Sequence, residues 1–200
     1  VQWAFKVITR LSGVSVTVIG EENIPDEAVL FIGNHRSYFD IVLTYSRCKR
    51  LTGYIAKKEV QKVPFLSVWM QYLYCLFLDR ENAKEGLKTI LKAIEYVKNG
   101  ISIFIFPEGT RNKGEELSLL PFKDGAFRIA TKTGCPIVPV SLNNTADILE
   151  NHFPHIKKTH VVIEYGKPIY PNELDAETKK HIGAYVQNIV QETINKNAEI

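Results

Sequence analysis

Apolar residues along this chain of 200 residues gather in short runs, separated by segments with a helical spacing of apolar positions. The run 101–106 is apolar almost throughout, which is typical of a strand covered on both faces of a sheet. Similar runs predict further strands at 14–19, 28–33, 51–56, 72–78, 137–142 and 160–165.

The clearest predicted helix lies between two of these strands. Its apolar positions follow the i, i+3, i+4, i+7 spacing from Leu87 to Val97, lysines occupy most of the opposite side, and Asn99 and Gly100 end it. Weaker helical patterns cover 125–132 and 175–195. Strands that alternate with helices predict an α/β fold, a single domain over residues 1–200 with a central, mainly parallel sheet flanked by helices.

Composition and charge narrow the class of protein. The chain is 45% hydrophobic and 24% charged with a formal net charge of +3, so a strongly basic nucleic-acid binder is excluded. The three cysteines, Cys48, Cys75 and Cys135, are far apart and form no C-x-x-C motif. A disulfide framework or zinc site is therefore not expected, and a reducing compartment is favoured.

Membrane contact is expected at a surface rather than through a span. No stretch reaches the roughly 18 uninterrupted apolar residues of a membrane-crossing helix. The chain begins at Val1, and we expect residues 1–12 to be the last part of a membrane-associated element whose earlier part is absent from this chain. Lys57, Lys58 and Lys62 come before the apolar segment 63–70, which suits an anionic membrane surface. The alternative is a buried helix with a solvated lysine rim.

The segment Asn34-His35-Arg36-Ser37-Tyr38-Phe39-Asp40 follows a predicted strand. Ser37 and Asp40 have the spacing of a capping box, so Asp40 is expected in the first turn of a helix, where an acidic side chain is favourable. One interpretation is that Asp40 only caps the helix. The other is that Asp40 reaches back to His35, orients its ring and leaves it free to take a proton from a hydroxyl.

The second motif, Phe106-Pro107-Glu108-Gly109-Thr110-Arg111, follows the most apolar strand. Glu108 and Arg111 could form a local salt bridge where the strand ends. Arginine also binds phosphate through two N–H groups at once, which lysine does less well. Since binding loops gather at the carboxyl ends of parallel strands, both motifs are expected at one site.

The ordered motifs resemble those of the glycerolipid acyltransferases, in particular bacterial 1-acylglycerol-3-phosphate (lysophosphatidic acid) acyltransferases. Four blocks, which together cover about residues 28 to 142, carry the resemblance in the family's order: 34–40, 56–59 through 77–80, 106–111 and 136–140. The chain departs from the pattern at Ser67 and again near Cys75, where many relatives have glycine. These two sites lie in the apolar stretch expected to pack the acyl chain, so they leave the chain-length preference open.

The resemblance implies that an acyl group passes from acyl carrier protein or coenzyme A to the 2-hydroxyl of lysophosphatidic acid, at the cytoplasmic face of the cell membrane. His35 would be the general base and Asp40 its orienting partner. The implied phosphate side of the site would be shaped by Arg80, Glu108, Gly109, Thr110, Arg111 and Lys123, with Glu108 positioning Arg111 or a substrate hydroxyl. No metal or other cofactor is implied, and we expect activity to survive EDTA; full loss that a divalent ion restores would favour a metal enzyme. Backbone N–H groups where the helix after His35 begins are the expected oxyanion donors.

Other functions fit parts of the pattern. A serine hydrolase could use Ser37, but the chain has no G-x-S-x-G elbow. A metal phosphohydrolase could use His35, Asp40 and Glu108, but no second cluster of ligands accompanies them. An acyltransferase acting on glycerol-3-phosphate or another lysophospholipid is the nearest alternative, and a non-catalytic lipid-binding module is the alternative from another class.

Overall fold

A computed structural model describes all 200 residues, and its centre is one seven-stranded sheet of order β1-β7-β6-β2-β5-β3-β4. Neighbouring strands pair in parallel except β6 and β7, so β1 and β7 run against the other five. This confirms the predicted α/β fold. The strands are β1 (Ser15–Ile19), β2 (Leu30–Gly33), β3 (Thr52–Lys57), β4 (Leu76–Leu78), β5 (Ser102–Ile105), β6 (Ile137–Asn143) and β7 (His160–Tyr165).

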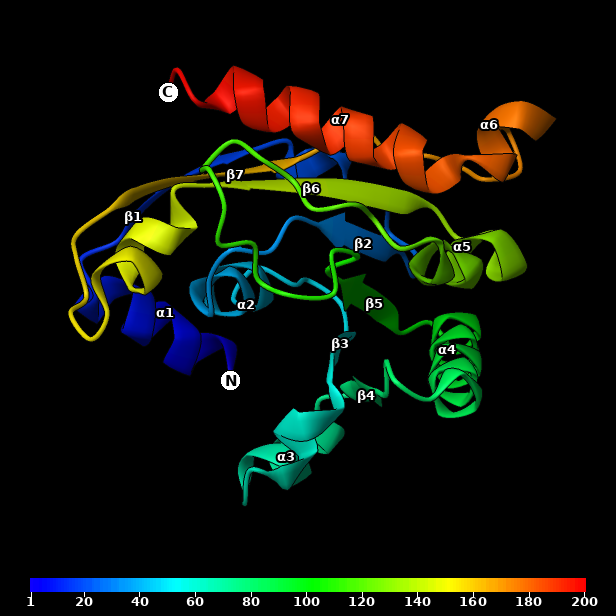
Figure 1. Cartoon of the computed structure of the whole chain (residues 1–200), viewed down its shortest axis with the longest axis horizontal. Helices are drawn as coiled ribbons and strands as arrows, with labels where there is room; N and C mark the ends of the chain where they lie inside the picture. The colour runs from blue at the N-terminus through cyan, green and yellow to red at the C-terminus, as the bar shows by residue number, and fades with distance from the viewer.

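Helices cover both faces of the sheet (Figure 1), which is why several strands are apolar without alternation. Ile103 and Ile105 pack in a core under α4, α5 and α7, whereas Phe104 and Phe106 pack on the other face with Leu43 of α2. None of the helices has the length and apolar character needed to cross a bilayer. The helices are α1 (Gln2–Leu11), α2 (Phe39–Tyr45), α3 (Leu66–Tyr72), α4 (Ala83–Lys98), α5 (Arg128–Thr133), α6 (Ala176–Lys180) and α7 (Ile182–Asn197).

Two predicted elements differ from the structure. The predicted strand 72–78 is a strand only at Leu76–Leu78, because α3 continues to Tyr72 and the chain then turns at Tyr74, whose φ is 59°. A short apolar run fits a helix or a strand equally well, so its pattern could not separate the two. The predicted helix 175–195 is two helices that meet at His181, since α7 buries a face against the sheet and α6 buries no residue.

The sheet topology brings the two motifs together. Strands β2 and β5 are parallel neighbours, with Leu30 opposite Ile103 and Ile32 opposite Ile105. Their carboxyl ends therefore meet at one edge of the sheet, and the loops 34–38 and 106–112 leave it side by side. Figure 1 shows the chain running from the end of β2 into α2.

Candidate active site

His35 and Asp40 form the centre of the candidate site. Asp40 is fully buried in the first turn of α2, and its Oδ2 lies 2.7 Å from Nδ1 of His35. The same oxygen accepts hydrogen bonds from the backbone N–H groups of Arg36 at 2.7 Å and Ser37 at 2.8 Å. Because the carboxylate is an acceptor, Nδ1 of His35 carries the hydrogen and Nε2 keeps its lone pair. The site thus contains an oriented imidazole with a free acceptor nitrogen.

The start of α2 resembles the predicted capping box, with one difference. Asp40 reaches back to the N–H of Ser37, as the box requires. The Ser37 hydroxyl, however, accepts from the N–H of Phe39 at 3.0 Å rather than from that of Asp40. The helix begins at Phe39, so Tyr38 occupies the residue before it. Capping and orientation of His35 are therefore performed by the same carboxylate.

The loop after β5 holds His35 in place. The His35 ring stacks on Phe106 with a centroid distance of 4.2 Å and an interplanar angle of 15°. Its backbone N–H donates to Oε1 of Glu108 at 2.7 Å, and its carbonyl accepts from the N–H of Asn112 at 2.7 Å. The His35 side chain is 16% exposed, so the ring is fixed on one side and open to a ligand on the other.

Glu108 differs from its expected place among the substrate contacts. It is 3% exposed, and its second oxygen accepts from the N–H of Leu120 at 2.9 Å. It does not pair with Arg111, so the expected positioning of Arg111 by Glu108 is wrong. Burial raises the pKa of the Glu108 carboxyl, while the N–H donors of His35 and Leu120 oppose that rise. Glu108 instead joins the two loops that surround His35.

We expect Glu108→Gln to lower the free energy of unfolding by about 1–3 kcal/mol, because an amide satisfies one of the two N–H donors and opposes the other. The raised pKa makes the native state bind this proton more readily than the unfolded chain. Glu108 therefore lowers stability as pH rises from its ordinary pKa of 4.5 to the raised value. Glutamine does not titrate, so the stability of the variant does not fall in this way as pH rises. The difference in stability between wild type and Glu108→Gln should therefore be larger near pH 4.5 than at neutral pH.

Urea unfolding at both pH values checks this prediction. Glu115→Gln is the matched control, since Glu115 is exposed on the same loop and its carboxylate makes no hydrogen bond or ion pair. Equal losses of stability for Glu108→Gln at the two pH values, or a larger loss at neutral pH, would contradict the assigned effect of burial.

Arg111 has a partner that the sequence did not indicate. Its guanidinium lies 3.8 Å over the ring of Tyr38 and donates to the Tyr38 hydroxyl at 3.2 Å and to Oε1 of Glu150 at 2.9 Å. Glu150 also accepts from the Ser37 hydroxyl at 2.5 Å and the Tyr38 N–H at 2.8 Å. Glu150 thus ties Arg111 to the start of α2. It follows Arg111 by 39 positions and belongs to no motif, so no pattern could have identified it.

The other expected phosphate contacts lie in a separate groove. Arg80, Gly109 and Lys123 line a cavity of about 260 Å³ that also includes Phe106, the residue stacked on His35. Gly109 has a φ of +78°, and a Cβ there would lie 3.0 Å from Nζ of Lys123. Arg111 and the exposed Thr110 do not line this groove. Its apolar walls include Ile55, Leu78, Leu87, Ile90 and Ile105.

Two buried polar residues of the first motif support the loops. The Asn34 amide accepts from the N–H of Leu142 and donates to the Leu142 carbonyl, both at 2.8 Å, which fixes the end of β2 against β6. Arg36 donates to the carbonyls of Gly114 and Glu115 at 2.7 and 2.9 Å, and it is 5% exposed. These residues hold the loops around His35, a function that we did not infer from the sequence.

The expected oxyanion donors at the start of α2 are already bonded. The N–H groups of Arg36 and Ser37 donate to Asp40, that of Tyr38 donates to Glu150, and that of Phe39 donates to Ser37. That expectation is therefore wrong, because each group has an acceptor within the chain. The structure also contains no group of three His, Cys, Asp or Glu side chains arranged to hold a metal ion. That the reaction needs no metal stays a prediction.

Known proteins with similar sequences are acyltransferases. Residues 15–143 match the family model described as Acyltransferase, and this range contains both motifs. The 1-acyl-sn-glycerol-3-phosphate acyltransferase of Saccharomyces cerevisiae is 34% identical over 197 residues, covering 98% of this chain and 64% of the relative. The enzyme of the same name from Borreliella burgdorferi is 35% identical over 143 residues, covering 70% of this chain and 56% of the relative. The chain thus spans less than two thirds of either relative.

A solved structure agrees in fold. The crystal structure of the 1-acyl-sn-glycerophosphate acyltransferase from Thermotoga maritima has a TM-score of 0.84 and 29% sequence identity, and the match covers 98% of this chain and 78% of that chain. These matches confirm the resemblance inferred from the motifs. The chain belongs to the acyltransferase family.

Proposed function

We propose that this chain transfers a fatty acyl group from a thioester of coenzyme A or acyl carrier protein to the 2-hydroxyl of lysophosphatidic acid, which yields phosphatidic acid. The observation that carries the proposal is the 2.7 Å contact between His35 and Asp40, which leaves Nε2 of His35 able to accept a proton. The names of the relatives support the choice of acceptor.

The proposed reaction needs one base and no covalent enzyme intermediate. Nε2 of His35 removes the proton of the 2-hydroxyl as its oxygen attacks the thioester carbonyl carbon. The tetrahedral intermediate then expels the thiolate, which takes the proton from His35, so the ring returns to its starting state. Asp40 stabilises the imidazolium between the two proton transfers. General-base assistance of this kind contributes roughly 10²–10⁴-fold.

Other donors must stabilise the oxyanion of that intermediate. The turn after β5 offers backbone N–H groups at Thr110 and Arg111, neither of which donates to an acceptor within the chain. We propose these two groups as the donors, in place of those at the start of α2. The φ of +78° at Gly109 supports this choice, because it turns the chain sharply just before them.

The phosphate of the acceptor is proposed to bind Arg111 and the groove cations Arg80 and Lys123. Arg111 uses one N–H on Glu150 and one on Tyr38, so further N–H groups of its guanidinium stay free for phosphate. Lys123 and Arg80 lie at the groove that shares Phe106 with the His35 site. The apolar walls of the groove are proposed to hold part of an acyl chain.

We expect Arg111→Lys to raise KM for lysophosphatidic acid about tenfold and to change KM for the thioester little, because lysine loses the planar contact with Tyr38 and the two-pronged hold on phosphate. Steady-state kinetics with each substrate varied in turn measures this. Arg50→Lys is the matched control, since Arg50 pairs with Asp26 at 2.8 Å outside the site. An equal rise in both KM values would count against phosphate binding by Arg111.

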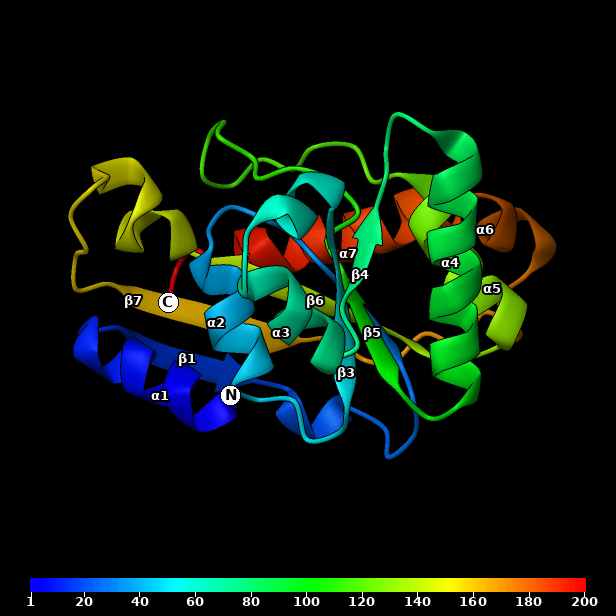
Figure 2. The ribbon, with the colours of Figure 1, turned by 90° about the horizontal axis from the view of Figure 1, so that it is seen from below.

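Location at the cytoplasmic face of the membrane is part of the proposal, with an apolar surface on α1 and α3 as the point of contact. Trp3 is 78% exposed, Phe65 90% and Tyr72 79%, and Phe5 joins the two helices by an edge contact with Trp69. Figure 1 and Figure 2 place α1 and α3 on the same face of the molecule. The alternative to membrane contact was a buried helix with a solvated lysine rim. Helix α3 instead exposes apolar side chains such as those of Val68 and Tyr72.

One assay tests the proposed function. Purified protein is given lysophosphatidic acid in detergent micelles with acyl-coenzyme A or acyl carrier protein thioester, and lipid products are identified by mass spectrometry. Phosphatidic acid formed by wild type and not by His35→Ala supports the proposal. Free fatty acid alone would indicate a hydrolase, and binding without turnover would indicate a lipid-binding module. Faster turnover of glycerol-3-phosphate or another lysophospholipid would reassign the acceptor.

A further inference from the structure

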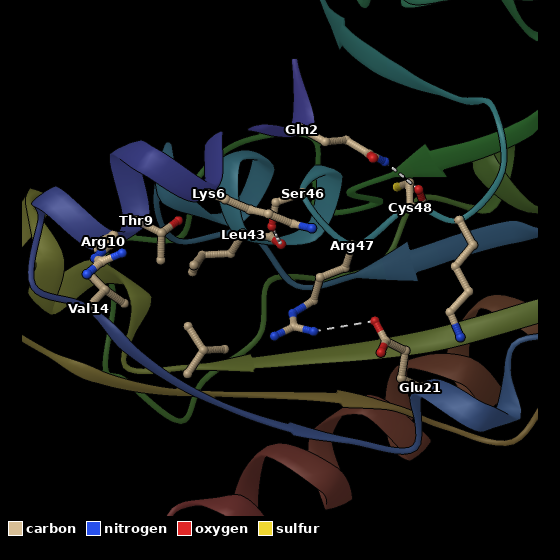
Figure 3. A pocket seen from close by; sticks show the side chains of 12 residues that line it. Gln2, Lys6, Thr9, Arg10, Val14, Glu21, Leu43, Ser46, Arg47 and Cys48 are labelled. Atoms are coloured by element: carbon tan, nitrogen blue, oxygen red, sulfur yellow. Dashed lines mark hydrogen bonds and ion pairs between the residues drawn. The ribbon is translucent and has the colours of Figure 1, made fainter. Parts of the chain in front are cut away.

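A long basic trough lies between α1, the end of α2 and β1 (Figure 3). Its volume is about 690 Å³, within the roughly 300–1,000 Å³ typical of ligand sites. Lys6 and Arg47 project into its middle, Arg10 lies at one end, and Glu21 lies at the other. With Lys49, four cationic side chains and one carboxylate line the trough.

The trough is separate from the proposed catalytic centre. His35 and Asp40 lie where α2 begins, whereas Arg47 and Lys49 follow the residue at which α2 ends. The seven residues of α2 put roughly 10 Å between the two ends at 1.5 Å per residue. No residue of the trough lines the groove beside Phe106.

Charge in the trough is not balanced by the chain itself. Arg47 pairs with Glu21 at 3.4 Å, while Lys6, Arg10 and Lys49 form no ion pair. Lysines on other surfaces of this protein do find carboxylates, as Lys196 does with Glu164 at 2.6 Å. Several cations facing one hollow repel one another, so an anion bound there would be stabilised by all of them.

The helix that supplies two of these cations also carries exposed apolar side chains. On α1, Leu11 is 82% exposed, Trp3 78% and Ile8 41%, and the helix buries no residue. A basic and apolar helix of this kind lies in the interface of a bilayer, with its cations at the level of the headgroups. At such an interface, the phosphates of lipid headgroups are the anions that the trough would meet.

We propose that this trough binds the phosphate-bearing headgroup of an anionic membrane phospholipid, at a site distinct from the one where the acceptor reacts. The proposal rests on the proposed function only in taking the membrane as the place where the protein works. Lys6, Arg10 and Lys49 contact the phosphate, and Arg47 joins them when it leaves Glu21. The site couples membrane docking to anionic lipid without taking part in acyl transfer.

Vesicle sedimentation tests the proposal, with phosphatidylcholine alone compared with phosphatidylcholine mixed with phosphatidylglycerol. Phosphatidylglycerol is neither the proposed acceptor nor the proposed product, so the catalytic site does not contribute. We expect wild type to prefer the mixed vesicles and Lys6→Gln/Arg10→Gln to lose about tenfold of that preference. Glu21→Gln should strengthen it, because it removes the only carboxylate in the trough.

Lys167→Gln/Lys180→Gln is the matched control, since both lysines are exposed and unpaired elsewhere on the chain. A preference kept by Lys6→Gln/Arg10→Gln, or lost equally in the control, would overturn the site. Displacement from mixed vesicles by inorganic phosphate, beyond that by chloride at equal ionic strength, would reassign the ligand to free phosphate. Acyl transfer to lysophosphatidic acid in detergent micelles should be the same in every variant as in wild type. Absence of this activity in wild type would overturn the proposed function, but the vesicle sedimentation would still test the trough.

Discussion

His35→Ala should reduce acyl transfer by about 10²–10⁴-fold while the fold stays intact. The imidazole is the only base held with a free nitrogen at the site. Asp40 and Glu108 are buried, Oδ2 of Asp40 accepts from the His35 ring and two backbone N–H groups, and both oxygens of Glu108 accept from backbone N–H groups. The backbone bonds of His35 to Glu108 and Asn112 do not involve the ring and remain in the variant. The loss should therefore appear in kcat, with KM for lysophosphatidic acid changed little. Product formation followed by mass spectrometry, together with circular dichroism, measures both parts.

Ser37→Ala is the companion variant for this test. Ser37 donates its hydroxyl to Glu150 and accepts from the N–H of Phe39, so its side chain serves the start of α2. Its removal should leave most of the activity, whereas a serine nucleophile would lose nearly all of it. Normal turnover by His35→Ala, or complete loss in Ser37→Ala, would refute the general-base mechanism.

The centre of the candidate site could be predicted because its information is local. His35 and Asp40 are five positions apart, a strand precedes them, and the spacing of Ser37 and Asp40 specifies where a helix begins. Once Asp40 is in the first turn, its carboxylate points back towards the end of the strand, where His35 lies. The contact of 2.7 Å follows from these few residues with little help from the rest of the fold.

The surroundings of that centre could not be predicted, because they depend on contacts between distant segments. Glu108 and Arg111 are close in sequence and opposite in charge, so a local salt bridge is one of the two interpretations that the motif allows, beside phosphate binding by Arg111. The turn at Gly109 instead directs Glu108 inward to His35 and Leu120, while Arg111 finds Glu150. The partners of Glu108 and Arg111 are decided by how distant loops pack, and neither the periodicity nor the motifs of the sequence carry that information.

The fold shows the same limit. Continuous apolar runs predicted the central strands because both faces of the sheet are covered, as Phe104 and Ile105 demonstrate on opposite faces. The pattern predicts a strand over the whole run from Tyr72 to Leu78, whereas only Leu76–Leu78 form one, because side chains such as Tyr72 are apolar and yet 79% exposed. These apolar residues lie on the surface of the protein, so the rule that apolar residues mark the core does not hold for them.

Asp40→Asn should lower kcat by about 10²–10⁴-fold, close to the loss from His35→Ala, because the two residues act as one unit. The amide oxygen of asparagine can take the place of Oδ2, but a neutral group stabilises the imidazolium less than a carboxylate does. If the amide turns its NH₂ group towards His35, Nδ1 becomes the acceptor and the proton moves to Nε2, which can then no longer receive one. Either orientation impairs the base.

Asp40→Ala separates this effect from the effect on the fold. Asp40 is fully buried, and alanine at this position leaves the ring Nδ1–H of His35 and the backbone N–H groups of Arg36 and Ser37 without their acceptor. Each unsatisfied buried donor costs about 1–3 kcal/mol. Asp40→Asn should therefore unfold at a urea concentration closer to wild type than Asp40→Ala does, yet be almost as inactive. The double variant His35→Ala/Asp40→Asn should be no less active than His35→Ala alone, since Asp40 acts through the ring. A further large loss in the double variant would mean that Asp40 contributes to turnover by a route that does not pass through His35.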